Sequence, residues 1–264
     1  MISLVVVRRI DAHNLGLQGF TMSSVRELMR SHVSVRSFSE EPIAPETLLS
    51  IIEAGQSAST SSHVQAYSVV RVTDPAKRQA ISEAAGGQKW VVSAPEFLVY
   101  CADLRRLNYA CTKAGMGELE GLTEHSVAAA VDVALFAQNV LLAAESEGLG
   151  GVFIGGIRNA PDVVIGQLEL PEFVFPLFGM CLGTPKERNA TKPRLPLEAV
   201  LHTDSYDSEK IQPLVDGYDE VMAAYYADRG VAGTNWSESV SKALQLKRRE
   251  HMREMLNDSG FFRS

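Results

Sequence analysis

Apolar positions alternate between the helical and the strand period along this chain, and no long linker separates the segments. The helical period predicts short helices over residues 24–29, 45–58 and 76–85. In the second of these, Leu48, Ile51 and Ile52 share one stripe, and Pro45 occupies the first turn, where its missing N–H costs nothing. Short apolar runs bounded by turn residues predict buried strands over 69–72, 97–101 and 152–154.

The longest helical pattern covers residues 126–147 and is apolar around almost its whole circumference. Asp132, Gln138 and Asn139 are its main interruptions. A stretch of this length could be mistaken for a membrane span, but the polar groups and the many alanines favour a fully buried helix. Helices this apolar are common in subunit interfaces, and Gly148 is placed to end the helix.

Residues 1–21 show no usable helical or strand period. Their first apolar run is followed by Arg8 and Arg9, which reverses the charge order of a secretory signal, and the run is too short to span a bilayer. Met22 begins a segment that looks like a new start with a helix N-cap. We therefore expect 1–21 to be a non-core extension, with a misplaced start codon as one explanation, and 22–264 to be the folded domain.

The polar side chains of His32, Ser34 and Arg36 fall at alternate positions of the segment 32–38. In an extended backbone they would point to one side, while the valines between them would face apolar packing on the other. Two potential cations and a hydroxyl on one edge suit a phosphorylated, hydroxyl-rich ligand. A polar strand end with a solvated arginine explains the pattern equally well, so this segment alone leaves both interpretations open.

A second basic feature is the tripeptide of Lys192, Pro193 and Arg194. Proline fixes an extended backbone, so the two cations form a rigid fork that suits a phosphate dianion. A solvated loop is an equally good explanation of the tripeptide taken alone.

A glycine-rich turn at Gly150 and Gly151 invites a dinucleotide-binding interpretation, which the order of elements excludes. The Rossmann fingerprint needs a strand before the glycines and a helix after them, whereas here the helix comes first and Phe153 stands at the third glycine position. Gly155 and Gly156, beyond the strand, would let a backbone N–H approach a flat ligand closely. A simple turn is the favoured alternative.

The chain has 264 residues, 45% of them hydrophobic and 22% charged, which is enough for one large domain or two intimate ones. A net charge of −7, spread along the chain, argues against nucleic acid or an anionic membrane surface as a partner. A local basic cluster in such a chain therefore indicates a pocket. The three cysteines are widely spaced and form no CxxC or metal-ligand pattern, which fits a reducing cytoplasm and predicts no metal site.

Several short blocks match one family in its own order, from about residue 24 to the C-terminal end. The blocks are HVSVRSF at 32–38, STSS at 59–62, GGQ at 86–88, AQN at 137–139, AAES at 143–146, GLGGVFIGGIR at 148–158, PLFG at 176–179 and KPRLP at 192–196. On these blocks the chain resembles the flavin-dependent nitroreductases, specifically the branch of oxygen-insensitive NADPH nitroreductases and flavin reductases. Single blocks such as the glycine turn are weak signals, whereas the ordered set is highly specific.

The resemblance implies an α+β, nitroreductase-like fold with a central, mainly antiparallel sheet flanked by helices. It implies an intertwined homodimer in which the long helix is buried in the interface and a C-terminal arm, about 200–264, packs on the partner subunit. It also implies one FMN in each of two interface sites, NADPH or NADH as electron donor and small-molecule acceptors, with no nucleic acid and no membrane.

Carried over by position, the resemblance assigns His32, Lys192 and Arg194 to the FMN phosphate, and Ser34 to the phosphate or the ribityl chain. Arg36 would lie at the flavin N1/O2 region, where a fixed cation stabilises the negative charge of the reduced ring. These assignments favour ligand binding over a solvated surface for both basic segments.

The flavin ring would be contacted by three further groups. Gln88 would hydrogen-bond the pyrimidine edge. A backbone N–H would meet N5, the atom that accepts and donates hydride, from the turn of Phe153, Ile154, Gly155 and Gly156. A serine-rich turn of the other subunit would line the ring, and it can also satisfy its own backbone; its members are Ser59, Thr60, Ser61 and Ser62.

The implied mechanism is ping-pong: NAD(P)H delivers hydride to FMN N5, and a nitroaromatic, quinone or other electron-poor acceptor then takes two electrons. No side-chain catalytic residue is required, which agrees with the absence of GxSxG, HExxH and P-loop motifs from the sequence. A flavin reductase that supplies reduced flavin to a partner and a non-catalytic flavin-binding protein are the alternatives.

The chain departs from the family pattern on the expected substrate side. The arginine-rich loop that grips the NADPH 2′-phosphate in close relatives is short here and keeps Arg229, which favours NADPH over NADH only weakly. His63, next to Ser62, stands where relatives often place an apolar aromatic beside the flavin. Arg249 matches a pocket arginine of the C-terminal arm, and one charge on a solvated helix over 247–253 is its rival explanation.

Overall fold

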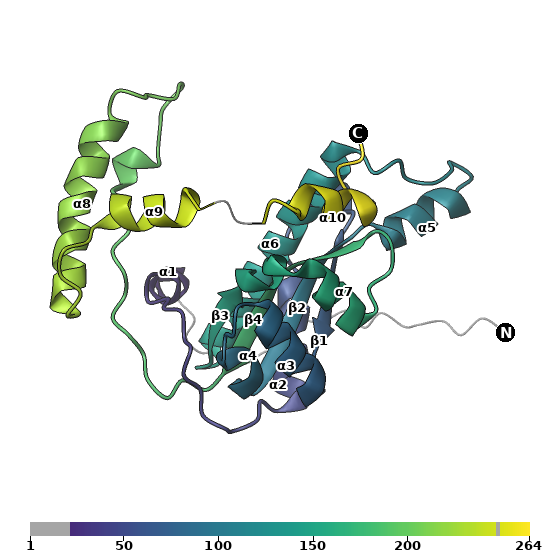
Figure 1. Cartoon of the computed structure of the whole chain (residues 1–264), viewed down its shortest axis with the longest axis horizontal. Coiled ribbons are helices and arrows are strands. Elements are labelled where there is room, and N and C mark those ends of the chain that lie inside the picture. The colour runs from purple at the N-terminus through teal and green to yellow at the C-terminus, as the bar shows by residue number, and fades with distance from the viewer. Residues whose placement is uncertain (1–21, 247–248) are drawn as a thin grey trace.

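The computed structural model describes residues 22–246 and 249–264, so the expected extension over 1–21 lies outside the described part of the chain. In that part, one sheet has the strand order β1-β2-β4-β3, and every neighbouring pair is antiparallel (Figure 1). Its strands are β1 (Tyr67–Arg71), β2 (Glu96–Asp103), β3 (Gly150–Ile154) and β4 (Val174–Gly183). The first three confirm the predicted strands, whereas β4 has no counterpart among them.

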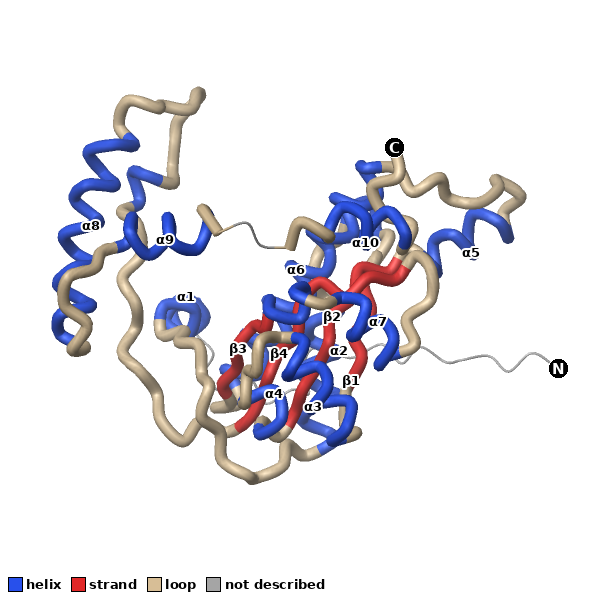
Figure 2. The backbone as a smooth tube through the Cα atoms, viewed as in Figure 1, coloured by secondary structure: helices blue, strands red, loops and turns tan. Residues whose placement is uncertain are grey.

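Helices cover both faces of the sheet, so the fold has three layers (Figure 2). One face is covered by α2 (Pro45–Gln56) and α6 (Thr123–Ser146). The other face is covered by α3 (Pro75–Ala84), α4 (Trp90–Ser93), α7 (Pro161–Leu168) and a short 3₁₀ turn, η2 (Gly155–Asn159). The predicted helices over 45–58 and 76–85 are therefore confirmed within a residue or two, and both pack on the sheet.

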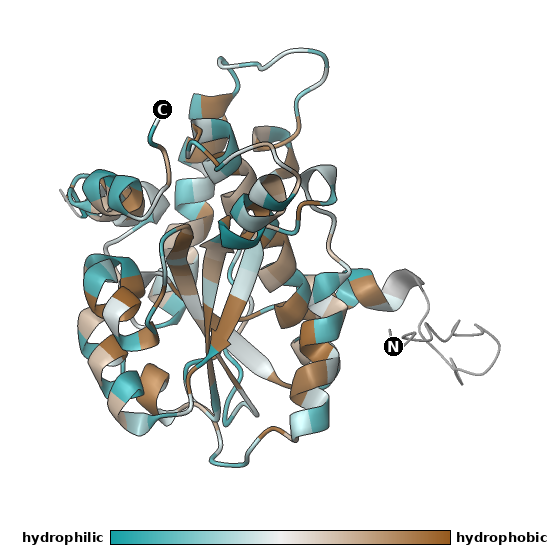
Figure 3. Ribbon diagram, turned by 90° about the vertical axis from the view of Figure 1, so that its right-hand side faces the viewer, coloured by the Kyte–Doolittle hydropathy of each residue, from teal (hydrophilic) through white to brown (hydrophobic). Residues whose placement is uncertain are grey.

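The alternation of strand β2 explains the two cores. Leu98 and Tyr100 pack with α2 and α6, while Phe97 and Val99 point to the opposite face and pack with α3 and α4. Successive side chains of a strand face opposite sides, so a strand that is apolar at every position must be covered on both faces. In Figure 3 the hydrophobic colour runs along the central strands and recurs on the flanking helices.

Helix α6 is less buried than its sequence predicts. It buries Ala129, Val133, Phe136 and other apolar side chains against the sheet, but Val127, Val131 and Leu135 are 46%, 51% and 44% exposed. By length and composition α6 could cross a membrane, yet its inner side contacts the sheet and α2. One apolar stripe of α6 therefore stays open in a single chain, and its expected burial in a subunit interface stays a prediction.

The C-terminal third leaves the three layers and comes back. After β4 the chain passes a 3₁₀ turn, η3 (Leu197–Ala199), and forms α8 (Ile211–Asp228) and α9 (Trp236–Leu244), which stand apart from the sheet in Figure 1. It returns through α10 (Met252–Asp258), and the last residues bind the start of α6, where the Thr123 N–H donates to the Ser264 carbonyl at 2.9 Å.

Two further helices are α1 (Met22–Arg30), which precedes all the strands, and α5 (Arg105–Lys113), which follows β2 in the chain. Helix α1 confirms the short helix predicted over 24–29. The rival explanation of Arg249, a solvated helix over 247–253, does not fit the described part of that range, and residues 247 and 248 lie outside it. Arg249 has a left-handed φ of 62°, and α10 begins only at Met252.

All three cysteines are free thiols. Cys101 in β2 and Cys181 in β4 are buried, and Cys111 in α5 is partly exposed. Burial raises the pKa of the Cys101 thiol to about 12 and also raises the pKa of Cys181. Both strand cysteines are therefore packing residues with little thiolate character.

Candidate functional site

The segment after α1 is extended, as its alternating polarity predicts, but it is not a strand of the sheet. Val33 and Val35 are buried and face the core, while the side chains of His32, Ser34 and Arg36 reach the other side. The Val35 N–H donates to the Gly151 carbonyl at 3.0 Å, which ties the segment to β3. Packing of the valines therefore orients the three polar side chains.

The Lys192–Arg194 fork lies opposite this segment. The chain reaches it from the end of β4, and the Tyr218 hydroxyl of α8 donates to the Pro193 carbonyl at 2.8 Å. This hydrogen bond fixes the backbone between Lys192 and Arg194. The two basic features, more than 150 residues apart in sequence, thus share one cavity.

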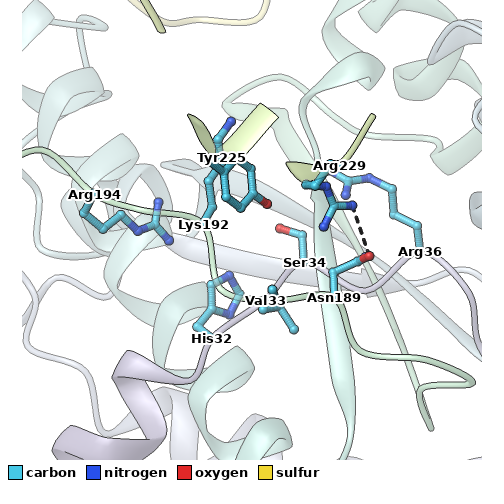
Figure 4. A pocket seen from close by; sticks show the side chains of 10 residues that line it. His32, Val33, Ser34, Arg36, Asn189, Lys192, Arg194, Tyr225 and Arg229 are labelled. Carbon is cyan, nitrogen blue, oxygen red and sulfur yellow. Dashed lines mark hydrogen bonds between the residues drawn. The ribbon is translucent and has the colours of Figure 1, made fainter. Parts of the chain in front are cut away.

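The cavity has a volume of about 270 Å³. Figure 4 shows the side chains of three chain segments converging on it. They are His32, Val33, Ser34 and Arg36 after α1, Asn189, Ala190, Lys192 and Arg194 after β4, Tyr225 on α8, and Arg229 at the C-cap of α8. Four permanent cations and one histidine therefore border a single pocket.

Carboxylates are nearly absent from the pocket. Among the described residues, Arg36, Lys192, Arg194 and Arg229 form no ion pair with an acidic side chain. His32 is the exception, because its Nδ1 lies 2.6 Å from Oε1 of Glu145. A cluster of unneutralised cations is costly unless an anion binds, so the pocket is built for an anionic group.

Helix α8 forms one wall of this pocket, which the sequence analysis did not foresee. Arg229 donates to Asn189 Oδ1 at 3.2 Å and lies over the ring of Tyr225, with Cζ 5.6 Å from its centroid (Figure 4). Lys192 donates to the Tyr226 hydroxyl at 3.1 Å, and this bond lowers the pKa of Tyr226. Arg229, assigned to NAD(P)H from the sequence, thus belongs to the wall of the anion pocket.

Gln88 and the glycine turn lie together at a second place. The Gln88 amide donates to the Ala85 carbonyl at 2.9 Å. A Cβ on Gly156 would collide with this amide and would lie 2.5 Å from the same carbonyl oxygen, so only glycine fits there. The close approach that the two glycines allow is therefore used within the protein, between Gly156 and the Gln88 loop.

Arg36 connects the two places. Its guanidinium carbon lies 5.8 Å from the centroid of the Trp90 ring, and Trp90 follows Gln88 by two residues at the start of α4. A guanidinium over an indole face is a favourable cation–π arrangement. The pocket and the Gln88 loop are thus two ends of one surface, with Arg36 between them.

Two arginines adjoin the glycine turn. Arg158 is half-buried and donates to the Leu177 carbonyl, and Arg249 donates to Asn159 Oδ1 at 2.9 Å. Burial and the charge of Arg249 lower the pKa of Arg158. Arg249 therefore sits beside the turn that contains Gly155, with a defined partner instead of a place on a solvated helix. Phe153 of the same turn is exposed and packs edge-on against Phe178.

The serine-rich turn lies elsewhere in a single chain. None of Ser59, Thr60, Ser61, Ser62 and His63 borders the anion pocket. Asp132, fully buried in α6, accepts hydrogen bonds from the backbone N–H groups of Ser61 and Ala66, at 3.0 and 3.1 Å. Ser62, His63 and Gln65 have left-handed φ values of 46°, 59° and 52°. Strained backbone held by a buried carboxylate is typical of a functional turn.

Comparison with known proteins decides the family. Residues 29–184 match the Nitroreductase family, and residues 192–264 match the Nitroreductase family, C-terminal domain. The chain belongs to the nitroreductase family. The nitroreductase-like fold expected from the sequence motifs is thereby confirmed, together with its antiparallel sheet.

Among its relatives, this nitroreductase family member is 42% identical to the oxygen-insensitive NADPH nitroreductase of Salmonella typhimurium over 242 residues, 91% of this chain and 99% of that protein. It is 41% identical to the FMN reductase [NAD(P)H] of Bacillus subtilis, over 91% of this chain and 98% of that one. The structure of the NfrA1 nitroreductase from B. subtilis superposes with a TM-score of 0.87 at 36% identity, covering 91% and 100% of the two chains.

In this family member the predicted site residues fall into three groups. His32, Ser34, Arg36, Lys192, Arg194 and Arg229 share the anion pocket. Gln88, Gly155, Gly156 and Arg249 lie around the glycine turn. Residues 59–63 lie apart from both. The sequence analysis missed Asn189, Tyr225 and Glu145 as parts of the pocket and its surroundings, although the motif block at 143–146 includes Glu145.

Proposed function

We propose that the chain is an FMN-dependent NAD(P)H oxidoreductase that reduces nitroaromatics, quinones or similar electron-poor acceptors. The proposal rests on the cationic pocket. Arg36 borders this pocket and also lies over the ring of Trp90, next to the Gln88 loop, which in turn contacts the glycine turn. The names of the Salmonella and Bacillus relatives, which specify NADPH, NAD(P)H and FMN, support the same conclusion.

The residues fit FMN at both of its ends. The cations and the Ser34 hydroxyl suit a phosphate monoester and the first ribityl hydroxyls. The ring would then extend past Arg36 toward Gln88, whose amide can donate and accept at a pyrimidine edge. When bound, FMN supplies the two-electron carrier between the nicotinamide and the acceptor.

The residues of the chain would bind the cofactor, orient it and set the charge around its ring. Lys192 and Arg194, on a backbone fixed by Pro193, hold the phosphate end, and Arg36 presents a fixed cation that favours negative charge on a reduced ring. The turn at Gly155 would present a backbone N–H to a bound ring, because glycine has no side chain to keep the two apart. No side-chain acid or nucleophile of the chain has to enter the reaction.

A homodimer would complete the site. The open stripe of Val127, Val131 and Leu135 on α6 supplies an apolar contact surface, and the C-terminal arm around α8 and α9 would pack on the partner subunit. The turn over 59–63, which lies far from its own pocket, would then line the site of the other chain. Free, largely buried cysteines suit a cytoplasmic protein.

NADPH is the proposed electron donor, with NADH as the weaker alternative. The structure places Arg229 in the wall of the anion pocket, so the preference no longer depends on that residue. It rests on the relatives named for NADPH.

The test is a steady-state panel on the purified full chain. Its flavin content is measured first, and NADPH oxidation is then followed with nitrofurazone, menadione and free FMN as acceptors. We expect a yellow protein that reduces the first two, with NADH slower than NADPH. A colourless protein that ignores added FMN would contradict the proposal. Arg26→Ala, at an exposed position of α1 outside the pocket, is the matched control variant.

A flavin reductase that releases reduced FMN to a partner is the second candidate, favoured by the Bacillus relative named FMN reductase. It predicts faster NADPH oxidation with free FMN than with menadione, and exchange of bound FMN for free FMN within the time of one turnover. A flavin-bound protein that no pyridine nucleotide reduces would instead support a non-catalytic flavin-binding role.

A further inference from the structure

Glu145 occupies an unfavourable place for a carboxylate. It stands in the last turn of α6, where the helix dipole disfavours negative charge, and its side chain is only 4% exposed. Burial of an ionised carboxylate costs several kcal/mol unless a partner compensates it. Within the described residues, its one side-chain partner is His32, whose Nδ1 lies 2.6 Å from Oε1.

The pairing determines which edge of the His32 ring is free. With Nδ1 turned to Glu145, the opposite edge, which carries Nε2, is left for the cavity that His32 borders. His32 is 26% exposed, so this edge is accessible from the pocket while the carboxylate behind it is not. Glu145 itself does not border the pocket.

The hydrogen-bonding capacity of imidazole then limits what Nε2 can do. A neutral ring that donates from Nδ1 to a carboxylate has only a lone pair at Nε2, so it has no proton there to donate to a phosphate oxygen. An imidazolium donates from both nitrogens, one to Glu145 and one into the pocket. A carboxylate behind a histidine is a known arrangement for fixing ring orientation and proton placement.

We propose that Glu145 is a positioning residue for phosphate recognition, acting through His32: it fixes the ring so that a protonated Nε2 donates to a phosphate monoester in the pocket. The inference rests on the proposed FMN function and goes beyond it, because it assigns a role to a buried residue that touches no part of the ligand. This role also explains why His32 is paired with a buried carboxylate although the pocket beside it is cationic.

The experiment compares two ligands that differ only in the phosphate. Affinities for FMN and riboflavin are measured by fluorescence quenching on the full-length apoprotein, for wild type, Glu145→Leu and Glu145→Gln. We expect Glu145→Leu to weaken FMN binding about 10-fold or more and to leave riboflavin binding within about twofold. Glu145→Gln, which keeps a hydrogen bond without the charge, should fall between wild type and the leucine variant.

A double-mutant cycle separates the proposed route from a general effect. In a His32→Ala background, Glu145→Leu should change FMN affinity no further, because the residue that transmits the effect is gone. The ¹⁵N spectrum of the His32 ring should show both nitrogens protonated in the FMN complex of the wild type, and one protonated nitrogen in the glutamine variant.

The outcomes that overturn the inference are distinct. Equal losses for FMN and riboflavin would reduce Glu145 to a structural residue, and unchanged FMN affinity in Glu145→Gln and Glu145→Leu would remove any role. Should the leucine variant fail to fold, the glutamine variant and His32→Ala decide the matter. A wild type that binds FMN far more tightly than riboflavin but reduces no acceptor would contradict the oxidoreductase function and leave this inference standing.

Discussion

Arg194 tests the assignment of the pocket at the scale of one residue. It borders the cavity and has no acidic partner among the described side chains, so its charge is free for a ligand. We expect Arg194→Ala to lower the affinity for FMN by about 1.5–3 kcal/mol, the range for hydrogen bonds to charged groups. Isothermal titration of the apoprotein measures this directly.

The same titration with Arg26→Ala gives the background, because Arg26 is exposed on α1 and takes no part in the pocket. If both variants bind FMN as tightly as the wild type, Arg194 has no contact with the phosphate. Riboflavin affinity should be unchanged in both.

Asp132 should be important for stability rather than for ligand affinity. Its two oxygens accept the backbone N–H groups of Ser61, in the serine-rich turn, and of Ala66, just before β1, and it is fully buried. In Asp132→Asn the side-chain amide nitrogen replaces one of the two acceptor oxygens. One backbone N–H group then faces another donor and has no acceptor. We expect a loss of about 1–3 kcal/mol in the free energy of unfolding, measured by urea titration at fixed protein concentration.

An asparagine at an exposed aspartate is the matched control for that substitution. Asp216→Asn on α8 removes the same charge from an exposed position. A control that loses as much stability as Asp132→Asn would mean that charge, and not the two hydrogen bonds, is responsible.

The sequence predicts the site residues whose side chains are oriented by the local backbone. It does not predict those that reach the site only through tertiary contacts. Alternation alone places His32, Ser34 and Arg36 on one edge, because the buried valines between them fix the backbone. No local sequence pattern indicates that Arg229 borders the same cavity, because only the tertiary fold of the C-terminal arm brings the end of α8 to the pocket. The left-handed backbone of Arg249 likewise depends on its contact with Asn159.

Helix α6 is the element for which packing in one chain is incomplete. Its stripe of Val127, Val131 and Leu135 stays exposed while the opposite side forms the core. If a second copy covers the stripe, an unpaired charge there is strongly unfavourable. We expect Val131→Glu to shift the protein from dimer to monomer at low micromolar concentration in sedimentation velocity.

Val163→Glu provides the comparison, because Val163 is an exposed valine of α7, on the other side of the sheet. A Val131→Glu protein that sediments like this control would show that the stripe is not the contact surface.

The helices and strands that were predicted correctly are those in which one sequence signal, such as a continuous apolar run, dominates. Strand β2 is apolar at nearly every position and was predictable, whereas β4 carries Pro176 and Gly179, two residues that weaken any strand signal. Proline is tolerated there because the register of β2 against β4 shifts at Tyr100 and Cys101, next to the proline. The position of the open stripe on α6 could not be predicted from periodicity, because apolar residues occupy almost the whole circumference of the helix.

At the scale of the whole molecule, ligand binding and stability are linked. Any ligand that binds only the folded chain stabilises it, by about 2.7 kcal/mol at a free concentration of 100 Kd. For a chain of 264 residues, this corresponds to a rise of about 5–10 °C in Tm. We expect FMN to produce this shift in a thermal scan and riboflavin at equal concentration to produce less, because riboflavin lacks the phosphate. No shift at saturating FMN would contradict the pocket assignment.

The distribution of the pocket over three distant segments also limits which truncated chains can bind a cofactor. Every strand of the described sheet precedes Lys192, Arg194 and Arg229, so the sheet is encoded by residues that come before most of the pocket's cations. A chain that ends before Lys192 therefore keeps the strands of the sheet but only Arg36 of the four permanent cations, and an excess of cofactor cannot restore its pocket.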